Sequence, residues 1–266
     1  MPLRIAFDLD GVLADMESEL VRQAEAIFGE AVARQLAKRA DKPAPQTETA
    51  PLPSSHDTAG ADDPVADFAA SRPAPAAKPD NTPPIVELNM TARQQRKLWR
   101  HVGTIENFWA SLGEIEPGVI TRLAALAADR RWEIIFLTKR PQTAGVTAQV
   151  QSQRWLQSKG FPLPSVYVVQ GSRGRIAEAL GLDVVVDDRP ENCLDVVVDS
   201  KARAILVWRD GESTLPSATR RLGIGVVKSV AECLDVLTAA DAPAPKDPGV
   251  LSRVKRMLGL TEAEPV

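Results

Sequence analysis

Short apolar runs that favour β-strands alternate with helix-like segments along most of this 266-residue chain, and this alternation constrains the fold more than any other feature. The strand-like runs are rich in β-branched and aromatic residues, and they cover 3–10, 133–138, 165–170, 183–188, 204–209 and 224–229. Segments with a helical spacing of apolar residues lie between them, at 117–130, 147–160 and 175–181. Apolar strands connected by helices predict a parallel sheet that is covered on both faces. The predicted fold class is therefore α/β, a Rossmann-like three-layer fold.

One segment interrupts this alternation after the first strand. Residues 41–84 hold ten of the 21 prolines and almost no large apolar side chains. Such a composition buries too little apolar surface to offset the entropy lost on ordering, so it predicts a disordered insertion. We interpret it as a tolerated surface loop, with a role in binding a partner as the alternative.

Helix-like sequence flanks the insertion on both sides and predicts a helical cap. The segments 16–40 and 85–113 contain the two expected helices, 16–39 and 91–113, and Thr91 with Gln94 forms a predicted capping box. We expect this cap to lie over the strand ends of a core made of 1–15 and 114–238. Residues 239–266 then form a Pro/Ala linker and a short amphipathic tail helix, for which docking on its own domain is the default expectation.

Composition removes several classes of function. The net charge of −3 and the pI of about 5.6 give no general attraction to a nucleic acid polymer. Two cysteines without a C-x-x-C spacing do not predict a disulfide framework or a zinc site, and two distant histidines give little support to a histidine base. Neither a signal peptide nor a run of apolar residues long enough to cross a membrane is recognisable. We therefore expect a cytoplasmic protein without integral membrane association.

Polar side chains follow three of the predicted strands, at the edge where ligands bind in parallel sheets. Asp8 and Asp10 are two residues apart at the end of the first strand, Thr138 ends the second long one, and the pair Asp187-Asp188 ends another. Paired carboxylates there can hold a hard cation such as Mg²⁺, or serve as nucleophile and proton shuttle. Taken alone, Asp8 and Asp10 also fit two solvated aspartates in a turn, but three such positions at one edge favour a site.

These motifs resemble those of the haloacid dehalogenase (HAD)-like superfamily of phosphotransferases. Its four motifs are matched by "IAFDLDGVL", by "IIFLT", by an arginine in "QGSRGRIAEALG" and by "VVVDD", and the match covers roughly 3–30 and 91–237. Within the superfamily, "FDLDGVLAD", "FWASL", "PGVITRLAAL", "RWL" and "VVVDDRPEN" are similar to the 5′-nucleotidase (deoxyribonucleotidase-like) branch. The third motif departs from the usual lysine, because Arg173 or Arg175 stands there and the spacing favours Arg173.

The resemblance implies a role for each matched residue. Asp8 attacks phosphorus to form an aspartyl phosphate, while Asp10 protonates the leaving oxygen and later deprotonates the attacking water. Thr138 and Arg173 bind the phosphate. The metal ligands are the carboxylates of Asp8 and Asp188 and the main-chain carbonyl of Asp10, and Asp187 supports Asp188 from behind. Independently of the family, carboxylates beside a phosphate repel it unless a cation offsets their charge, which predicts Mg²⁺.

The sequence Leu-Asp-Val-Val-Val-Asp occurs twice, at 182–187 and at 194–199. The first copy precedes the acidic pair, as a strand should. The second follows Pro190, which favours a helix start, so we expect the same letters to form a strand first and a helix second. Leu194, Val197 and Val198 are expected to face the sheet.

The cap sequence carries basic and aromatic residues whose roles the sequence leaves open. We expect an ordinary solvated helix face, with anion binding at the site mouth as the alternative, for Arg93, Arg96, Lys97, Arg100 and His101. We expect core packing, with stacking on a base as the alternative, for Trp99, Phe108 and Trp109.

Taken together, the sequence predicts a Mg²⁺-dependent phosphomonoester hydrolase with a helical cap, acting on a small phosphorylated substrate such as a 5′-nucleotide. The rival hypothesis is a HAD-like module that binds or regulates a partner with little or no turnover. The arginine in place of the third-motif lysine favours this rival, and the intact set of Asp8, Asp10 and Asp188 opposes it.

Overall fold

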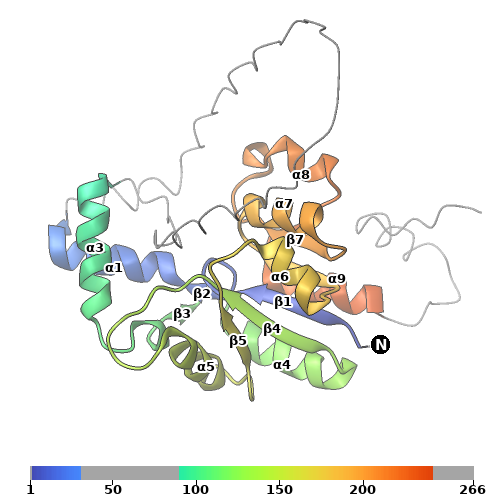
Figure 1. Cartoon of the computed structure of the whole chain (residues 1–266), viewed down its shortest axis with the longest axis horizontal. Helices are drawn as coiled ribbons and strands as arrows, with labels where there is room; N and C mark the ends of the chain where they lie inside the picture. The colour runs from blue at the N-terminus through green and yellow to red at the C-terminus, as the bar shows by residue number, and fades with distance from the viewer. Residues whose placement is uncertain (1, 31–89, 242–266) are drawn as a thin grey trace, which may run out of the picture.

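The computed structural model describes residues 2–30 and 90–241. Its main sheet has six strands in the order β5-β4-β1-β6-β7-β8, and every neighbouring pair is parallel. The strands are β1 (Arg4–Asp8), β4 (Glu133–Thr138), β5 (Ser165–Val168), β6 (Val184–Asp187), β7 (Arg203–Val207) and β8 (Gly225–Val227). Five of them lie within the predicted strand-like runs, and β7 begins one residue before its run, so the α/β fold class is confirmed (Figure 1).

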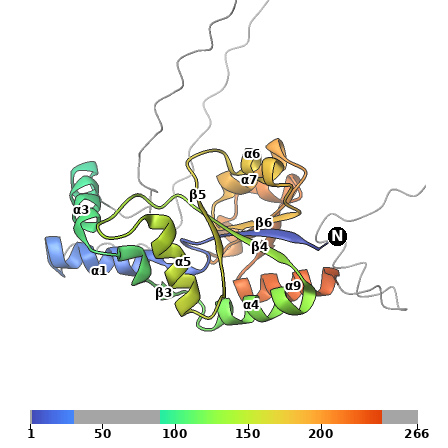
Figure 2. The ribbon, with the colours of Figure 1, turned by 60° about the horizontal axis from the view of Figure 1, so that its bottom comes forward.

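Helices cover both faces of this sheet. Helices α4 (Val119–Arg130) and α9 (Val230–Asp241) lie together on one side, while α6 (Arg173–Leu180) and α7 (Pro190–Asp199) lie on the other (Figure 2). The side chains of β1 alternate accordingly, because Ile5 and Phe7 belong to one hydrophobic cluster and Ala6 to the other. The chain is therefore three-layered, as the uninterrupted apolar strands predicted.

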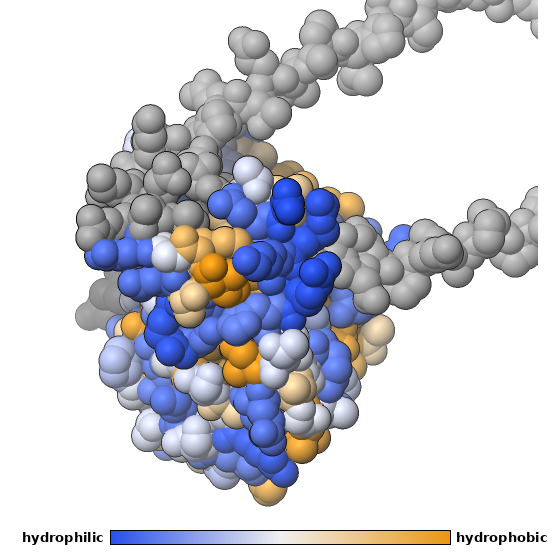
Figure 3. Space-filling model, turned by 90° about the vertical axis from the view of Figure 1, so that its left-hand side faces the viewer, coloured by the Kyte–Doolittle hydropathy of each residue, from blue (hydrophilic) through white to orange (hydrophobic). Residues whose placement is uncertain are grey.

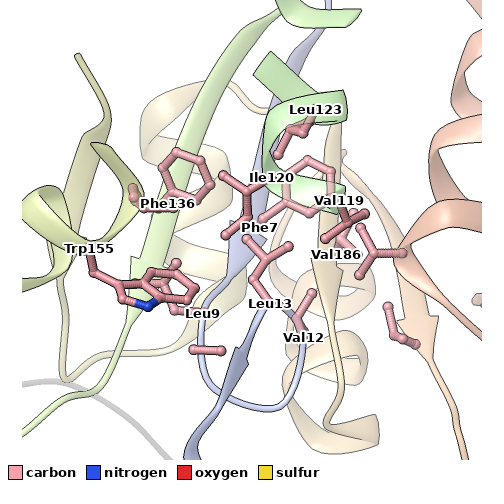
Figure 4. Close-up of a cluster of buried hydrophobic side chains, with 14 of the residues drawn as sticks. Phe7, Leu9, Val12, Leu13, Val119, Ile120, Leu123, Phe136, Trp155 and Val186 are labelled. Carbon is pink, nitrogen blue, oxygen red and sulfur yellow. The ribbon is translucent and has the colours of Figure 1, made fainter. Parts of the chain in front are cut away.

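The larger cluster lies directly beneath the polar strand ends. Figure 4 shows Phe7 of β1 close to Ile120 and Leu123 of α4, with Phe136 of β4 on one side. Helix α5 (Ala148–Ser158) contributes Trp155, which is almost fully buried. Burying a side chain of this size stabilises the fold by about 1.5–3 kcal/mol. The cluster therefore helps to keep the polar strand ends in fixed positions.

Helices α1 (Met16–Phe28) and α3 (Ala92–Thr104) lie side by side at one end of the molecule (Figure 1). His101 Nε2 is 3.1 Å from Gln23 Oε1, and the Lys97 ammonium lies 5.1 Å from the centre of the Phe28 ring. The predicted capping box at Thr91 is present, with the Gln94 amide donating to Thr91 Oγ1 over 3.3 Å. A short antiparallel pair, β2 (Ala14–Asp15) with β3 (Gly113–Glu114), joins the two passages between these helices and the sheet.

Both expected helices are interrupted. The expected helix 16–39 breaks after Phe28, because Gly29 has a φ of 82° and its amide turns back to the Glu25 carbonyl over 2.8 Å, and its part 31–39 lies outside the described residues. The expected helix 91–113 ends at Thr104, and Asn107 soon after it is left-handed with a φ of 53°. A single helical turn, η1 (Phe108–Ala110), follows.

The division into core and cap stays a prediction. The predicted insertion 41–84 and the tail helix within 239–266 lie outside the described residues, apart from 239–241, which end α9. Arg93, Arg96, Lys97 and Arg100 are exposed, as expected for a solvated helix face. Figure 3 looks onto this end of the molecule, where hydrophilic residues surround small hydrophobic areas.

The repeated hexapeptide forms a strand in its first copy and a helix in its second. Residues 184–187 are β6, and 194–199 lie in α7, which begins at Pro190. Of the three residues expected to face the sheet, Val197 packs against the smaller hydrophobic cluster, but Leu194 is 39% exposed and Val198 is 68% exposed, so the prediction is wrong for these two. Cys193 and Val196 are fully buried instead. The Asn192 side chain bonds to Asp187 at the start of the helix, and this bond fixes the rotation of the helix about its axis.

Within the described residues, no helix combines the length and the apolar character needed to cross a membrane.

Candidate active site

Asp8 and Asp187 end two neighbouring strands and therefore lie side by side at one sheet edge. Phe7 of β1 is in register with Val186 of β6, which places the following residue of each strand at the same level. Asp8 is 7% exposed and Asp187 is fully buried. Asp188 follows directly, and its carboxylate lies against the α-carbon of Gly11 in the turn after β1. The strand ends thus bring Asp8, Asp187 and Asp188 together, as the sequence predicted.

Arg173 sits between two of these acids. It begins α6 because the Ser172 hydroxyl caps that helix, accepting from the Arg175 amide over 3.5 Å. Its Nη2 donates a hydrogen bond to Asp8 Oδ1, and its Nε lies 3.5 Å from Asp187 Oδ2. The side chain of Arg175, by contrast, is 84% exposed and 3.9 Å from Asp199. Of the two arginines that the sequence left open, Arg173 lies at the site.

Arg173 is also incompletely satisfied. The residue is 2% exposed, and its Nε and Nη1 have no hydrogen-bond partner. A buried donor without a partner costs about 1–3 kcal/mol, and more when it is charged. Since Nε lies in the ion pair with Asp187, Nη1 is the donor that is left for an oxygen of an anion.

Asp10 is bound by a separate set of donors. Its carboxylate accepts a hydrogen bond from the Thr138 hydroxyl over 3.1 Å, and from Arg140 through Nε at 3.0 Å and Nη2 at 2.7 Å. In this arrangement the Thr138 hydroxyl donates its hydrogen bond to Asp10. The predicted role of Thr138 in holding a phosphate oxygen stays a prediction.

Asp187 is held firmly by the start of α7. Its Oδ1 accepts from the Arg189 amide over 2.9 Å, and both of its oxygens lie 3.0 Å from the Asn192 side-chain amide. Together with the ion pair to Arg173, these contacts occupy most of its acceptor sites. Asp188 is therefore the member of the pair with more freedom to bind a ligand, which agrees with the supporting position predicted for Asp187.

Acidic side chains outnumber basic ones around Asp8, where Asp187, Asp188 and Asp10 are opposed by Arg173. Burial raises the pKa of Asp8 well above its usual range; Arg173 opposes the rise, and Asp187, Asp188 and Asp10 add to it. Burial also raises the pKa of Asp188 to about 7, with a further contribution from Asp187 and opposition from Arg189. Carboxylates with raised pKa values are a common property of sites that hold a cation or transfer protons.

A hard divalent cation is the metal that the sequence predicts for these donors. Among residues 2–30 and 90–241, no group of three or more His, Cys, Asp or Glu side chains is arranged to hold a metal ion. The ligand set implied by the sequence needs two carboxylates, of Asp8 and Asp188, and the main-chain carbonyl of Asp10. Mg²⁺ is commonly held by one or two carboxylates together with substrate phosphate and water. The excess negative charge of the buried acids is what such an ion would offset.

Comparison with known proteins finds similar folds at low sequence identity. No protein-family model matches the chain, and no curated protein matches it. It is similar to a HAD family hydrolase from Deinococcus radiodurans R1 with bound phosphate and sodium, at 16% identity and a TM-score of 0.46, over 91% of this chain and 99% of that one. A hydrolase from Pseudomonas syringae is similar at 14% identity and a TM-score of 0.47, over 89% and 98% of the two chains. A haloacid dehalogenase-like family hydrolase from Xanthomonas campestris is similar at 14% identity and a TM-score of 0.43, over 96% and 98%.

The places that the chain's own sequence motifs take in the structure are more informative than these similarities at low identity. Asp8 ends β1, Thr138 ends β4, Arg173 begins α6, and Asp187 ends β6 with Asp188 directly after it. Each motif therefore occupies the strand end or helix start that the resemblance implied. This agreement supports the resemblance of the sequence motifs to the haloacid dehalogenase-like superfamily.

Sequence reasoning missed Arg140. Its side chain is fully buried, its Nη1 donates to Ser152 Oγ over 2.8 Å, and its guanidinium lies 4.9 Å from the Trp109 ring and 5.7 Å from the Trp155 ring. The available signal was its place two residues after Thr138, at the same sheet edge as Asp10. Nothing in the local sequence shows that this arginine, rather than Lys139, turns inward.

Arg209 was missed for a similar reason. It follows β7 and donates to the main-chain carbonyls of Gly11 and Val12, over 2.6 and 3.1 Å, and to Glu116 over 2.8 Å. Glu116 in turn accepts the amides of Val230 and Ala231 at the start of α9. The turn that carries Gly11 is thus bonded to two other segments of the α/β fold.

Proposed function

We propose that this protein is a Mg²⁺-dependent phosphomonoester hydrolase that acts through an aspartyl-phosphate intermediate. The observation that carries the proposal is the buried Arg173 guanidinium, which is bonded to Asp8 and whose Nη1 has no hydrogen-bond partner. A phosphate group beside Asp8 supplies oxygens for Nη1 and Nη2, because arginine grips phosphate through parallel hydrogen bonds. The coarser conclusion, a phosphatase-type hydrolase, agrees with the resemblance to the HAD-like superfamily.

Asp8 is the nucleophile in this proposal. One of its carboxylate oxygens forms a bond to phosphorus while the bond from phosphorus to the ester oxygen breaks. Asp10 gives its proton to the departing oxygen, so that the alcohol leaves neutral. In the second half, Asp10 takes a proton from water, whose oxygen attacks phosphorus and releases inorganic phosphate and the free Asp8 carboxylate.

The remaining residues hold the phosphate and the cation. Arg173 and Thr138 bind phosphate oxygens, and the carboxylates of Asp8 and Asp188 with the Asp10 carbonyl hold Mg²⁺. The ion supplies charge neutralisation, which lets an anionic nucleophile approach an anionic phosphate. Asp187 fixes the neighbouring Asp188 through its bonds to Arg189 and Asn192.

A small phosphorylated metabolite is the substrate class, and a 5′-nucleotide is the specific proposal. It rests on the sequence segments that resemble the nucleotidase branch. Helix α1 follows the turn after β1 directly, and η1 contacts Arg140 through Trp109, so the segment that holds α1, α3 and η1 is the candidate for contacting the group that carries the phosphate. The protein is proposed to work in the cytoplasm, where nucleotides and Mg²⁺ are abundant.

A binding or regulatory module without turnover is the second candidate, and one observation favours it. Both proposed catalytic carboxylates are paired with arginine, Asp8 with Arg173 and Asp10 with Arg140. A carboxylate held by a guanidinium is a weaker nucleophile and a poorer proton donor than a free one. In this case the site would bind a phosphate group and keep it.

One experiment separates the two functions. The purified protein is given p-nitrophenyl phosphate and a panel of nucleoside monophosphates, with Mg²⁺ or EDTA, beside Asp8→Asn. Asp235→Asn is the matched control, because Asp235 is an exposed partner of Arg122 away from the site. The hydrolase predicts Mg²⁺-dependent phosphate release that Asp8→Asn abolishes and Asp235→Asn retains. Release that survives Asp8→Asn rules out the proposed mechanism, and binding of phosphate without release from any substrate supports the second candidate.

A further inference from the structure

We propose that Arg140 is a positioning residue for proton transfer by Asp10, and that the Trp109 segment acts on Asp10 through it. The inference rests on the proposed hydrolase function and adds a residue that none of the four motifs includes. Arg140 belongs to the loop after β4, whereas Trp109 belongs to η1, which follows α3. The contact between them joins the helical end of the molecule to the proton-transferring carboxylate.

The hydrogen bonds of Arg140 fix Asp10 in two directions. Nε lies 3.1 and 3.0 Å from the two Asp10 carboxylate oxygens, and Nη2 lies 2.7 Å from Oδ1. The rigid fork of a guanidinium sets the plane of the carboxylate as well as its distance, which the single point charge of a lysine does not do. The Thr138 hydroxyl adds a third donor, at 3.1 Å. A proton shuttle must be held within reach of both the leaving oxygen and the attacking water, so this orientation bears directly on its work.

Arg140 is itself held in place by aromatic and polar contacts. Its side chain is fully buried, between the Trp109 and Trp155 rings, and Nη1 is bonded to Ser152 of α5. A buried guanidinium is costly unless it is paired and fully bonded. Asp10 is the carboxylate that pairs it here, so the two residues depend on each other.

Trp109 is anchored on the same loop as Arg140. Its indole nitrogen donates to the Pro141 carbonyl over 2.9 Å, and its amide donates to Gln151 Oε1 over 3.0 Å. Asn107, two residues earlier, donates its amide to the Ala144 carbonyl over 2.8 Å. A movement of the chain that returns from α3 therefore displaces the ring against which the Arg140 guanidinium lies.

The test compares two substrates that differ in how much they need an acid. Phenolate is a much stronger base than p-nitrophenolate, so the loss of phenol from phenyl phosphate depends more on a proton from Asp10. The value of kcat/KM reports the steps up to formation of the aspartyl phosphate, where this proton is given. Full-length wild type, Arg140→Lys, Trp109→Leu and Asp10→Asn are assayed on both esters with Mg²⁺. Arg122→Lys is the control, since Arg122 forms an exposed ion pair with Asp235.

We expect Arg140→Lys to lower kcat/KM for phenyl phosphate roughly tenfold more than for p-nitrophenyl phosphate, the direction expected also for Asp10→Asn. Trp109→Leu is expected to show a smaller loss of kcat/KM with the same preference between the esters. The double variant Arg140→Lys/Trp109→Leu is expected to lose less than the product of the two single losses. Equal losses on both esters, or no loss, would overturn the inference, because a purely structural role does not distinguish leaving groups. If Arg140→Lys fails to fold, Trp109→Leu decides by the same criterion.

The outcomes also separate this inference from the function on which it rests. A wild-type protein that hydrolyses neither ester ends both. A wild-type protein whose activity is lost in Asp8→Asn, with Arg140→Lys unchanged in its preference between the esters, ends the inference alone.

Discussion

The α-carbon of Gly11 lies directly against the carboxylate of Asp188, so that a methyl group at this position would stand 2.0 Å from the Asp188 Oδ2 atom. Gly11 also has a φ of 85°, a conformation that residues with a side chain rarely adopt. Arg209 fixes the same turn through the Gly11 carbonyl. The position of a proposed metal ligand is therefore set by a glycine 177 residues away in the sequence.

Gly11→Ala is expected to weaken Mg²⁺ activation about 10–100-fold, because the new methyl group must push the Asp188 carboxylate away. The measurement is the Mg²⁺ concentration that gives half-maximal phosphate release. Gly118→Ala is the control, since Gly118 has a φ of 82° but no atom within 4 Å of its added methyl group. Both variants carry backbone strain of about 1–3 kcal/mol, and only the first should change the Mg²⁺ dependence. An equal change in both would show that strain alone is responsible.

The raised pKa values of Asp8 and Asp188 predict how Mg²⁺ stabilisation depends on pH. Burial and neighbouring acids raise the pKa of Asp188 to about 7, so without metal the folded protein holds a proton that the unfolded chain has released. The stability that this extra proton contributes is fully present below the usual aspartate pKa of about 4, and it is lost as the pH rises through about 7. Mg²⁺ binds the ionised carboxylates, so its stabilising effect should grow over the same range.

The check is the melting temperature with Mg²⁺ and with EDTA from about pH 5 to about pH 8. The difference between the two curves should widen toward high pH in the wild type. Asp188→Asn keeps the shape of the side chain and removes its charge, and it should narrow the difference at every pH. A Mg²⁺ effect that is constant across the range would contradict the assignment of these acids to the metal.

The fold could be predicted from the sequence because its decisive signals are local. Runs such as 133–138 and 183–188 are apolar and β-branched throughout, which favours buried parallel strands. Carboxylates at the ends of such strands must share an edge whatever the order of the strands, whereas the contact of Asp8 with Asp187 also depends on β1 lying next to β6. The Gly29 signal that ends α1 was local too, and the expected helix 16–39 overlooked it.

What could not be predicted depends on the rotation of helices and on the direction of side chains. The buried stripe of α7 is set by the bond from Asn192 to Asp187, which no periodicity shows. The inward turn of Arg140 requires both Asp10 and the two tryptophan rings, which come from three separate segments of the chain. Contacts of this kind are encoded in the sequence but become visible when the distant segments are placed together.

Gly174→Ala is expected to separate α6 from α7 and to displace Arg173. A methyl group at Gly174 would lie 2.0 Å from the Asp195 main-chain oxygen and 2.6 Å from Asp199 Cβ, and backbone atoms give way less easily than side chains. We expect a loss of about 1–3 kcal/mol in the free energy of unfolding, together with weaker binding of inorganic phosphate. Both are measurable, by chemical denaturation and by calorimetric titration.

The control for this variant is Gly103→Ala. Gly103 also lies within a helix, and nothing stands within 4 Å of its added methyl group. This substitution should be neutral or stabilise the protein by up to about 1 kcal/mol, because alanine favours helix more than glycine does. If the two variants have similar stability, the close approach of α6 to α7 is not as described.

The second copy of the repeated hexapeptide allows a test of its helical state within one short sequence. Val196 is fully buried, whereas Val198 is 68% exposed. In a strand, residues two apart face the same side, so Val196→Ala and Val198→Ala would have similar costs. In the helix α7 they face different sides, and we expect a loss of about 1–3 kcal/mol for Val196→Ala and a change within about 0.5 kcal/mol for Val198→Ala. Chemical denaturation of the two variants measures both values, and equal costs would favour the strand over the helix.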